Sequence, residues 1–451
     1  MTFLERSERA RNEKIDTDSE NVSAIMRGYK YPIAPWPIII SKGAVKEYTE
    51  VVQKLPEIFY AALDNYFGDN THTAAEYFGI SEYSYELFRN LNIPADGFMI
   101  RHDFVYHNDV IKLIETNVGS TIGGWQHDWF IDSVLKQFDK YEQISSLNLT
   151  RPNTFRAFFE ALVYQVLKTK PDRSEITIVI PCLAGLGREE TIEAVSEFCA
   201  FDKEPAFKNF HVNFDVIHET NEIQFNRDNY VFVNGKEVDA LLFTISSGFS
   251  SQLSTQIYNA TADNKLVFMD GLCRSVFGNK AMYALLHEPI VLNALSEYER
   301  DFIKKYVPWT FRLTHDDITH KSQVWARTEI LKQNKNKFLI KNVHSSQGED
   351  IFIGEQVDQA QWDAAVDSAA EEASWIAQQY CTPDTIESCN TQGELKRFDM
   401  VWGIFDLAGS YQGAFVRGSE VADSLGVINS SKGALEFFVF EEEEKLERIS
   451  L

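Results

Sequence analysis

Two short segments carry charged and amide side chains at a spacing that suits a phosphate-bearing ligand. Arg101 and Asp103 are two residues apart, and so are Glu115 and Asn117. Residues i and i+2 of a β-strand share a face, and a turn at 107–109 would pair the two segments. Two carboxylates and an amide oxygen suit Mg²⁺ that also holds phosphates, and an arginine suits a transferring phosphoryl group. A surface salt-bridge cluster is the alternative.

A second candidate is the lysine that ends an apolar strand. Phe338–Lys341 precedes the polar loop His344–Asp350, and Ile351–Ile353 forms a second strand-like run. A lysine in this place could neutralise phosphates under a loop whose backbone N–H groups point inward. The loop holds one glycine, Gly348, and is not a Walker motif. A plain hairpin with a solvated lysine is therefore the alternative.

Other catalytic patterns are missing from the sequence. The 10 His show no HExxH or other zinc-binding spacing, and no GxSxG is present. Gly185-Leu-Gly187 follows a strand-like run but lacks the third glycine of a dinucleotide loop, which favours a tight strand-to-helix turn. The 5 Cys form no CxxC pair, so structural thiols are the default interpretation.

Composition excludes several classes of protein and partner. The 451 residues include 43 Lys and Arg against 67 Asp and Glu, a net charge of −24. Nucleic acid and anionic membranes would repel such a chain, so neither is an expected partner. With 44% hydrophobic and 13% aromatic residues the chain can bury a large core and is not disordered. The sequence has no long apolar run and no signal-peptide pattern, and its cysteines favour a reducing compartment, which predicts a soluble cytoplasmic protein.

The elements that must position these residues follow from periodicity and turn signals. Helical patterns cover 45–66, 82–91, 129–138 and 154–169, and the first hairpin has strands at 98–106 and 110–116. Strands at 176–180, 212–217, 230–233 and 240–245, with a helix at 188–201, predict a parallel α/β unit. A long helix over 361–379 is expected to precede strands near 397–405 and 413–417.

Seven motifs in order carry a family resemblance. They are Arg101-x-Asp103, Glu115-x-Asn117 with Ser120, Gly278-Asn-Lys280-Ala281, Val307-Pro-Trp-Thr310, Phe338-Leu-Ile-Lys341, Gln378-Gln-Tyr-Cys381-Thr-Pro383 and Gly413-Ala-Phe-Val-Arg417-Gly418. Their order and spacing over roughly residues 95–440 resemble the synthetase domain of glutathionylspermidine synthase and its circularly permuted ATP-grasp relatives.

The resemblance implies an α/β (α+β) fold with a circularly permuted ATP-grasp core, an inserted Rossmann-like parallel α/β unit and a helical N-terminal segment. The expected units are a mostly helical segment at 1–95, the metal-binding half at 96–170, the Rossmann-like unit at 171–270 and the lysine and lid half at 271–451.

The resemblance also implies roles for individual residues. Catalytic roles fall to Arg101, which steadies the transferred phosphoryl group, and to Arg417, near the acyl phosphate. Mg²⁺ ligands would be Asp103, Glu115 and Asn117, and Ser120 would contact the substrate acid. The nucleotide would be bound by Lys280, Lys341, Gly348 and the hinge Gln378, Gln379, Tyr380 and Cys381.

The function that the resemblance implies is ATP-dependent joining of a small-molecule carboxylic acid to an amine. ATP and two Mg²⁺ ions would be used, with an acyl phosphate as the intermediate and ADP and phosphate as products. The acid would be an amino acid, a peptide or a glutathione-like molecule. Glutathionylspermidine synthesis itself and a non-catalytic nucleotide-binding protein are the alternatives. The sequence departs from the family in its acidic, glycine-poor lid loop, and residues 1–95 contain no cysteine for a thiol amidase.

Overall fold

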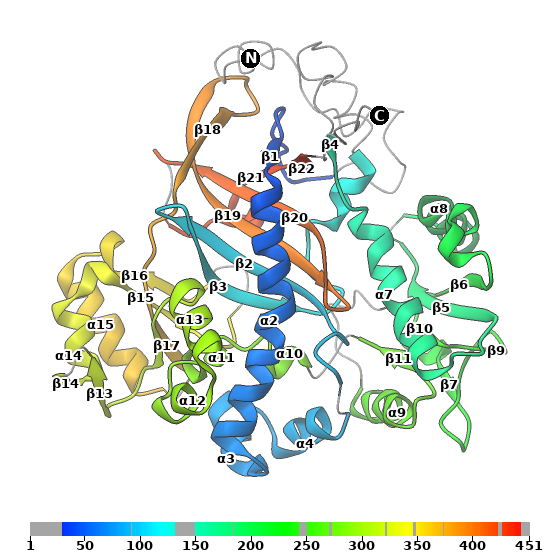
Figure 1. The fold of residues 1–451 in the computed structure, drawn as a ribbon, viewed down its shortest axis with the longest axis horizontal. Helices are drawn as coiled ribbons and strands as arrows, with labels where there is room; N and C mark the ends of the chain where they lie inside the picture. Colours follow the sequence, from blue (N-terminus) through cyan, green and yellow to red (C-terminus); the bar gives the residue numbers. More distant parts are fainter. Residues whose placement is uncertain are drawn as a thin grey trace, which may run out of the picture.

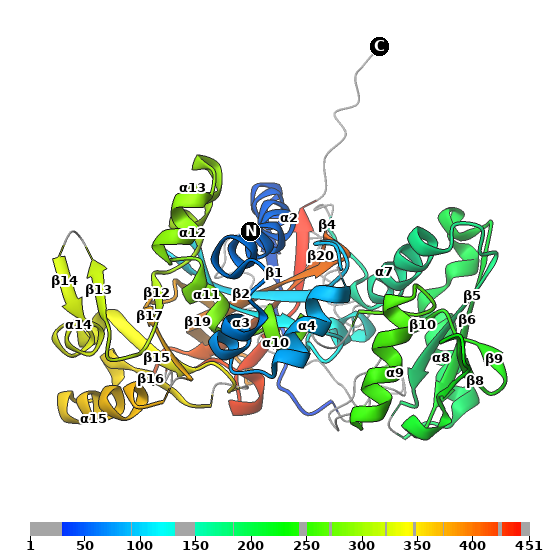
Figure 2. The same ribbon diagram turned by 90° about the horizontal axis from the view of Figure 1, so that it is seen from below.

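The computed structural model describes residues 29–91, 93–130, 149–183, 185–242, 250–269, 273–320, 323–345, 349–372, 374–422 and 426–442. A central sheet is flanked by two smaller α/β units (Figure 1). Seen from below, the two units lie on opposite sides of this sheet (Figure 2). Among the described residues, no helix combines the length and the apolar character needed to cross a bilayer.

The central sheet is antiparallel and has the strand order β21-β20-β19-β2-β3, with β18 paired to β19. Its strands are β2 (Met99–His107), β3 (Val110–Val118), β18 (Thr385–Cys389), β19 (Leu395–Leu407), β20 (Ser410–Glu420) and β21 (Leu435–Phe437). The sheet therefore joins strands from the predicted 96–170 unit to strands from the end of the predicted 271–451 unit.

The predicted hairpin of β2 and β3 is confirmed. Asn108 and Asp109 at its turn have φ of 52° and 61°, the left-handed values that a tight two-residue hairpin turn requires. Asp384 accepts hydrogen bonds from both of their backbone N–H groups, at 2.9 and 2.8 Å. A carboxylate distant in sequence therefore stabilises the turn that sets the hairpin register.

Helices from two parts of the chain cover the central sheet. The predicted first helix is α2 (Lys42–Phe67), which begins where the Ser41 side chain accepts from the N–H of Ala44. Tyr48, Val51 and Phe59 are among its buried residues, which share one hydrophobic core with β2, β3, β19 and β20. The other helices of this layer are α3 (Thr71–Phe78), α4 (Glu82–Leu91), α10 (Cys273–Val276), α11 (Ala281–Leu285), α12 (Pro289–Ala294) and α13 (Glu297–Tyr306).

The first flanking unit contains a four-stranded antiparallel sheet. Its order is β12 (Thr310–Arg312), β17 (Trp375–Gln379), β15 (Phe338–Asn342) and β16 (Ile351–Ile353). The helices α14 (Arg327–Gln333) and α15 (Gln359–Ala370) pack on it, and β13 (Asp317–His320) and β14 (Gln323–Ala326) form a separate hairpin.

One prediction in this unit is wrong. The helix expected over 361–379 ends at Ala370 as α15, and 375–379 is the strand β17 instead. This strand hydrogen-bonds with β15 on one side and β12 on the other. Pairing with strands distant in sequence outweighed the local helical pattern, as tertiary context commonly does.

The second flanking unit confirms a parallel sheet, but the strand predicted at 230–233 is not part of it, because this segment pairs antiparallel in a separate small sheet. The order of the parallel sheet is β11 (Val267–Phe268), β10 (Ala240–Leu241), β5 (Glu175–Pro181) and β6 (His211–Ile217). Helices α7 (Thr154–Thr169) and α8 (Arg188–Cys199) share a core with one face, and α9 (Ser251–Ala262) with the other. A small sheet of β7 (Gln224–Phe225), β8 (Val231–Val233) and β9 (Lys236–Glu237) completes it.

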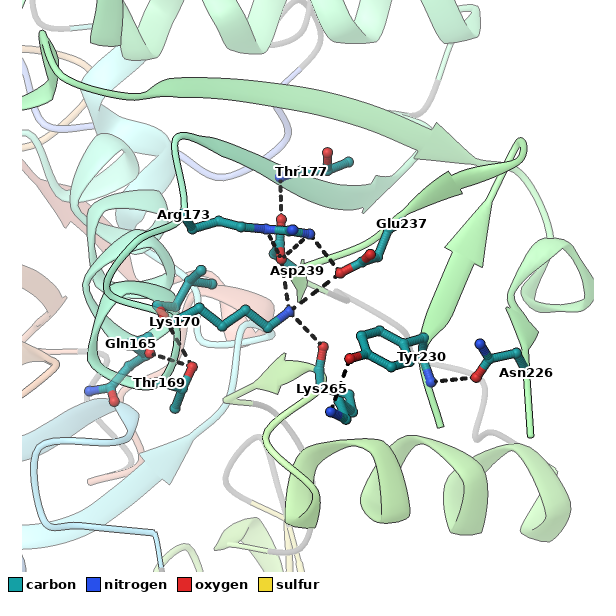
Figure 3. Close-up of polar contacts among 11 residues, drawn as sticks. Gln165, Thr169, Lys170, Arg173, Thr177, Asn226, Tyr230, Glu237, Asp239 and Lys265 are labelled. Carbon is teal, nitrogen blue, oxygen red and sulfur yellow. Dashed lines mark hydrogen bonds and ion pairs between the residues drawn. The ribbon is translucent and has the colours of Figure 1, made fainter. Parts of the chain in front are cut away.

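A buried carboxylate joins the elements of this unit (Figure 3). Asp239 accepts from Lys170 at 2.9 Å and from Arg173 at 3.0 Å, and also from the backbone N–H of Thr177 at 3.0 Å. Lys170 also donates to the carbonyl of Lys265 at 3.0 Å. These bonds tie the end of α7 to β5, and the Asp239 charge is fully paired, as a buried charge must be.

The remaining elements are short. Strands β1 (Ile38–Ile40), β22 (Val439–Glu442) and β4 (Leu149–Thr150) form a three-stranded sheet. The 3₁₀ turns are η2 (Trp125–Phe130), η3 (Phe201–Lys203), η4 (Pro205–Phe207), η5 (Thr220–Glu222), η6 (Lys335–Lys337), η7 (Gly354–Gln356) and η8 (Ser430–Lys432). The helix predicted at 129–138 falls almost entirely outside the described residues.

Candidate active site

The hairpin register brings the predicted cluster together. Arg101 pairs with Asn117, and Asp103 pairs with Glu115. Directly opposed residues of antiparallel strands point to the same face of a sheet, so all four side chains share one face. The sequence-based expectation of this grouping is confirmed.

Asp103 lies at the centre of a buried cluster with two arginines. Arg101 donates to it twice, from Nε to Oδ1 at 2.6 Å and from Nη2 to Oδ2 at 2.8 Å. Arg417 donates from Nη2 to the same Oδ2 at 2.7 Å. Burial raises the pKa of Asp103, but the two guanidinium groups outweigh it and hold this pKa below its usual value.

The hydrogen bonds of Asp103 bear on its predicted metal role. Both of its oxygens accept from guanidinium groups, and its side chain is fully buried. A cation at Asp103 would have to displace these bonds. Arg417 keeps one buried donor, Nε, for which the described residues offer no hydrogen-bond partner. The arrangement fits Asp103 as the residue that orients two arginines toward a ligand.

Gly403 makes this cluster possible, and the sequence analysis did not identify it. Gly403 on β19 pairs with Asp103 on β2 and with Phe415 on β20. A Cβ added here would lie 2.7 Å from Cδ of Arg101 and 2.9 Å from Oδ1 of Asp103. The missing side chain therefore leaves the space that the arginine and carboxylate occupy above β19.

Lys341 on β15 is buried and held in a fixed position. Its Nζ donates to the carbonyl of Ile114 at 2.7 Å and to Oε1 of Gln378 at 3.0 Å. The Gln378 amide in turn donates to Oγ1 of Thr310 at 3.0 Å. The side chain of Gln378 therefore positions the lysine. Burial lowers the pKa of Lys341 to about 7, with a further lowering by Lys280 and an opposing effect of Glu115.

Lys280 lies at the start of α11, close to Glu115 of β3. Its Nζ is 3.9 Å from Oε2 of Glu115 and donates to the backbone carbonyl of Ser345 at the start of the lid loop. Lys280, at the start of α11, and Lys341, on β15, therefore approach Glu115 from different elements of the fold. The structure places the two predicted phosphate-binding lysines on one site.

A narrow, mostly apolar cavity of about 100 Å³ lies beside Lys341. Its walls combine the central sheet with the hinge, which spans the end of β17 and the two residues after it. Residues from both sheets line it: Val105, Ile114, Leu339, Lys341, Gln378, Gln379, Tyr380, Cys381, Val401 and Ile428. All four predicted hinge residues are therefore at this cavity. The backbone N–H groups of Gln379 and Tyr380 are engaged, by the carbonyls of Trp309 and Lys337.

A wider cavity of about 620 Å³ adjoins the narrow one. Both are lined by Glu115, Lys280, Ser345, Arg417 and Asn429. The wider cavity also contains Arg101, Asn117, Arg274 and His344. Its walls therefore carry several cations, although the whole chain has a net charge of −24. A site with this charge distribution attracts anionic ligands.

Two predicted site residues that the structure describes, Asp103 and Ser120, line neither of these cavities. Ser120 is buried and lines a separate apolar cavity of about 40 Å³ with Phe155 and Phe158 of α7. Gly348 lies outside the described residues. Residues that sequence reasoning missed include Arg274 and Asn429, which line the wider cavity from α10 and from the segment before η8. No local motif marks them.

Glu115 and Asn117 are the candidate metal ligands that line the wider cavity. No group of three or more His, Cys, Asp or Glu residues that could hold a metal ion occurs among the described residues. Glu115, with its side chain about 32% exposed, and Asn117 are oxygen donors that line the wider cavity. Mg²⁺ at nucleotide sites needs few protein ligands, because substrate phosphates and waters complete its shell. The donor set fits that kind of site.

Comparison with known proteins gives a fold and no family. No family model and no curated protein sequence matches the chain. Among solved structures, a glutathione synthetase-like effector from Globodera pallida, in its apo form, matches with a TM-score of 0.56 and 13% identity, over 97% of this chain and 96% of that one. D-alanyl-alanine synthetase A from Vibrio cholerae matches with a TM-score of 0.23 and 13% identity, over 50% of this chain and 68% of that one. The first likeness shows a shared fold over nearly the whole chain.

Proposed function

We propose that the chain is an ATP-dependent carboxylate–amine ligase with a circularly permuted ATP-grasp core and an inserted Rossmann-like unit. One observation carries the proposal. A narrow apolar cavity beside a hinge opens into a wider, cation-lined cavity, and Glu115, Lys280 and Arg417 line both. A nucleotide needs an apolar place for its base and cations for its phosphates, and a second substrate needs room beyond them.

The nucleotide base would occupy the narrow cavity. Val105, Val401 and Ile428 supply apolar contacts there. Hinge backbone groups other than the engaged N–H groups of Gln379 and Tyr380 would hydrogen-bond the edge of the base. The phosphates would then extend toward Lys341 and Lys280. Because both lysines are already held by hydrogen bonds, little reorganisation is needed when the phosphates arrive.

Mg²⁺ would be held by Glu115 and Asn117 together with phosphate oxygens. When bound, it would neutralise charge on the nucleotide phosphates. Asp103 is assigned a positioning role here, because both its oxygens accept from Arg101 and Arg417. This assignment replaces the three-residue ligand set expected from the family resemblance.

The chemistry proposed has two steps. A carboxylate oxygen of the acid attacks the γ-phosphorus of ATP, the bond to the β,γ-bridging oxygen breaks, and ADP leaves. The amine nitrogen then attacks the carbonyl carbon of the acyl phosphate, loses a proton and expels phosphate. Arg101 and Arg417 stabilise the negative charge that moves between these oxygens, so catalysis is mostly positioning and electrostatics.

The test is ADP release from Mg-ATP against pooled amino acids, glutathione-like peptides and polyamines, with mass spectrometry of the products. Peptide-like acids are the first choice because the fold is shared with a protein described as glutathione synthetase-like. The proposal predicts substrate-dependent ADP and a product mass equal to acid plus amine minus water. Glutathione with spermidine tests glutathionylspermidine synthesis directly. ATP binding without turnover in any pool would favour a non-catalytic nucleotide-binding protein.

A further inference from the structure

A further cavity, of about 440 Å³, lies against the hinge, and Lys341 is not among its lining residues. Lys112 of β3, Arg300 and Lys304 of α13, and Trp309 line it. Gln379 and Cys381 line both this cavity and the narrow cavity proposed for the nucleotide base. The two cavities therefore share part of one wall.

The charged groups at this cavity are all basic. None of the described residues that line it is Asp or Glu. Within the described part of the chain, Lys112, Arg300 and Lys304 form no ion pair. By contrast, the neighbouring Lys305 is paired with Glu47 at 3.0 Å. Three unpaired cations around one cavity are unexpected in a chain with a net charge of −24, because most cations of such a protein have an acidic neighbour available.

Backbone carbonyls hold two of these cations in place. Nζ of Lys112 donates to the carbonyl of Lys305, and Arg300 donates to the carbonyl of Leu295. Each retains further N–H donors for a ligand. Holding the side chains in advance reduces the conformational entropy lost when an anion binds.

The rest of the lining is apolar and aromatic. Leu292, Ile303, Pro308 and Trp309 contribute to it. His287, whose pKa burial lowers to about 4, is neutral there at pH 7. The volume is within the range of small-molecule sites, which combine apolar walls with a few polar groups. A ligand for this cavity needs a flat apolar body and at least two negative charges.

We propose that this cavity binds a small organic dianion, of the aryl phosphate or aromatic dicarboxylate type. The bound dianion would contact the hinge through Gln379 and Cys381, which line both cavities. The site is separate from the proposed active site and does not depend on the proposed ligase activity. The dianion would contact Lys112, Arg300 and Lys304 while its ring packs on Trp309.

The test uses 4-nitrophenyl phosphate as the probe, in titration calorimetry with the full chain. We expect saturable binding with a dissociation constant below about 1 mM, weakened by added salt because the cations are near the surface. Lys304→Glu should weaken binding about tenfold or more, since a cation is replaced by a repelling charge. Lys208→Glu, an equal charge change at an exposed lysine of the parallel unit, should leave it within twofold.

A second variant separates this cavity from the nucleotide site. Lys341→Met removes the lysine of the narrow cavity and should leave probe binding unchanged. Trp309→Phe should reduce the quenching of tryptophan fluorescence that the nitroaryl ring produces. The proposal is overturned if the probe does not bind, or if Lys341→Met abolishes binding while Lys304→Glu does not. An equal loss in the Lys304 and Lys208 variants would also overturn it, because it would indicate a general charge effect.

Discussion

Arg417 donates from Nη2 to Oδ2 of Asp103 at 2.7 Å, and the two residues lie on strands that are separated by the whole width of β19. Gly403 of β19 pairs with Asp103 and has no side chain to occupy the space of Arg101 and Asp103. Arg101 donates two hydrogen bonds to the same carboxylate. One buried acid thus fixes two arginines at the edge of the cavity in which we place phosphoryl transfer.

Gly403→Ala should disrupt this cluster. The added Cβ would meet Arg101 and Asp103 atoms at 2.7–2.9 Å, closer than such contacts allow. We expect a loss of about 1–3 kcal/mol in the free energy of unfolding and a greater loss of ligase turnover than of nucleotide affinity. Urea unfolding and ADP release measure the two effects. Gly43→Ala, in the first turn of α2 where the nearest atom is at 3.6 Å, is the control and should not destabilise. Equal behaviour of both variants would argue against the role of Gly403.

Asp103→Asn tests the charge of the buried acid. Removing one partner from a buried ion pair costs about 3–5 kcal/mol, so the variant should be clearly less stable at pH 7. The pKa of Asp103 is lowered on folding because the two arginines outweigh the effect of burial. Its stabilising contribution is therefore present above about pH 4, the unfolded-state pKa, and is lost as the pH falls through the lower folded-state pKa.

The difference in unfolding free energy between the wild type and Asp103→Asn should accordingly shrink as the pH is lowered from 5 to about 2.5. Denaturant unfolding over this range measures it. A difference that stays constant with pH would mean that the Asp103 charge does not stabilise the fold, and it would contradict the structural assignment.

Lys341 should take up a proton when nucleotide binds. Its pKa of about 7 in the free protein makes it mostly neutral at pH 8, and a polyphosphate nearby would restore its charge. We expect uptake of about one proton at pH 8, seen as a dependence of the calorimetric enthalpy on the ionisation enthalpy of the buffer. Lys341→Arg, which stays charged, should show none. Identical proton uptake in both proteins would show that Lys341 is not the group concerned.

The same lysine makes stability rise with pH, as Asp103 does, but in a higher pH range. The unfolded chain binds a proton at Lys341 up to about pH 10.4 and the folded chain only up to about 7, so stability rises with pH between these values. Lys341→Met should remove that part of the pH dependence. Thermal unfolding between pH 7 and 10 provides the comparison, and an unaltered slope in the variant would contradict it.

Glu115→Gln should weaken the dependence of nucleotide binding on Mg²⁺. The substitution keeps the shape of the side chain and removes the charge that we assign to the ion. We expect the Mg²⁺ concentration for half-maximal ATP binding to rise about tenfold or more, with a smaller change in binding of ATP alone. Glu387→Gln, on the exposed part of β18, is the matched control. A Mg²⁺ dependence equal to wild type would place the ion elsewhere.

The sequence predicted that the four polar side chains of β2 and β3 lie together, because that grouping depends on local rules. Alternation in a strand puts Arg101 and Asp103 on one face, and a two-residue turn aligns them with Asn117 and Glu115. The requirement for Gly403 could not be predicted in this way. It arises only when β19, about 300 residues further along the chain, is placed beside β2.

The structure of the hinge also depends on contacts with residues distant in sequence, which local patterns do not predict. Trp375–Gln379 continues the apolar pattern of α15 and was expected to be helical, but its pairing with β12 and β15 makes it a strand. Gln378 therefore points its amide at Lys341, a contact that no local pattern indicates. Ser120 lies two residues after the end of β3 in sequence, yet it faces a different cavity, with Phe155 and Phe158.

The central claim is that a carboxylate attacks the γ-phosphate at the junction of the two cavities. Its most direct test is a reaction with the acid found in the pooled assay, labelled with ¹⁸O in its carboxylate, followed by mass spectrometry of the phosphate released. An acyl phosphate intermediate predicts one ¹⁸O atom transferred from the acid to phosphate, with ADP as the nucleotide product. Phosphate without label, or label in AMP, would contradict the account.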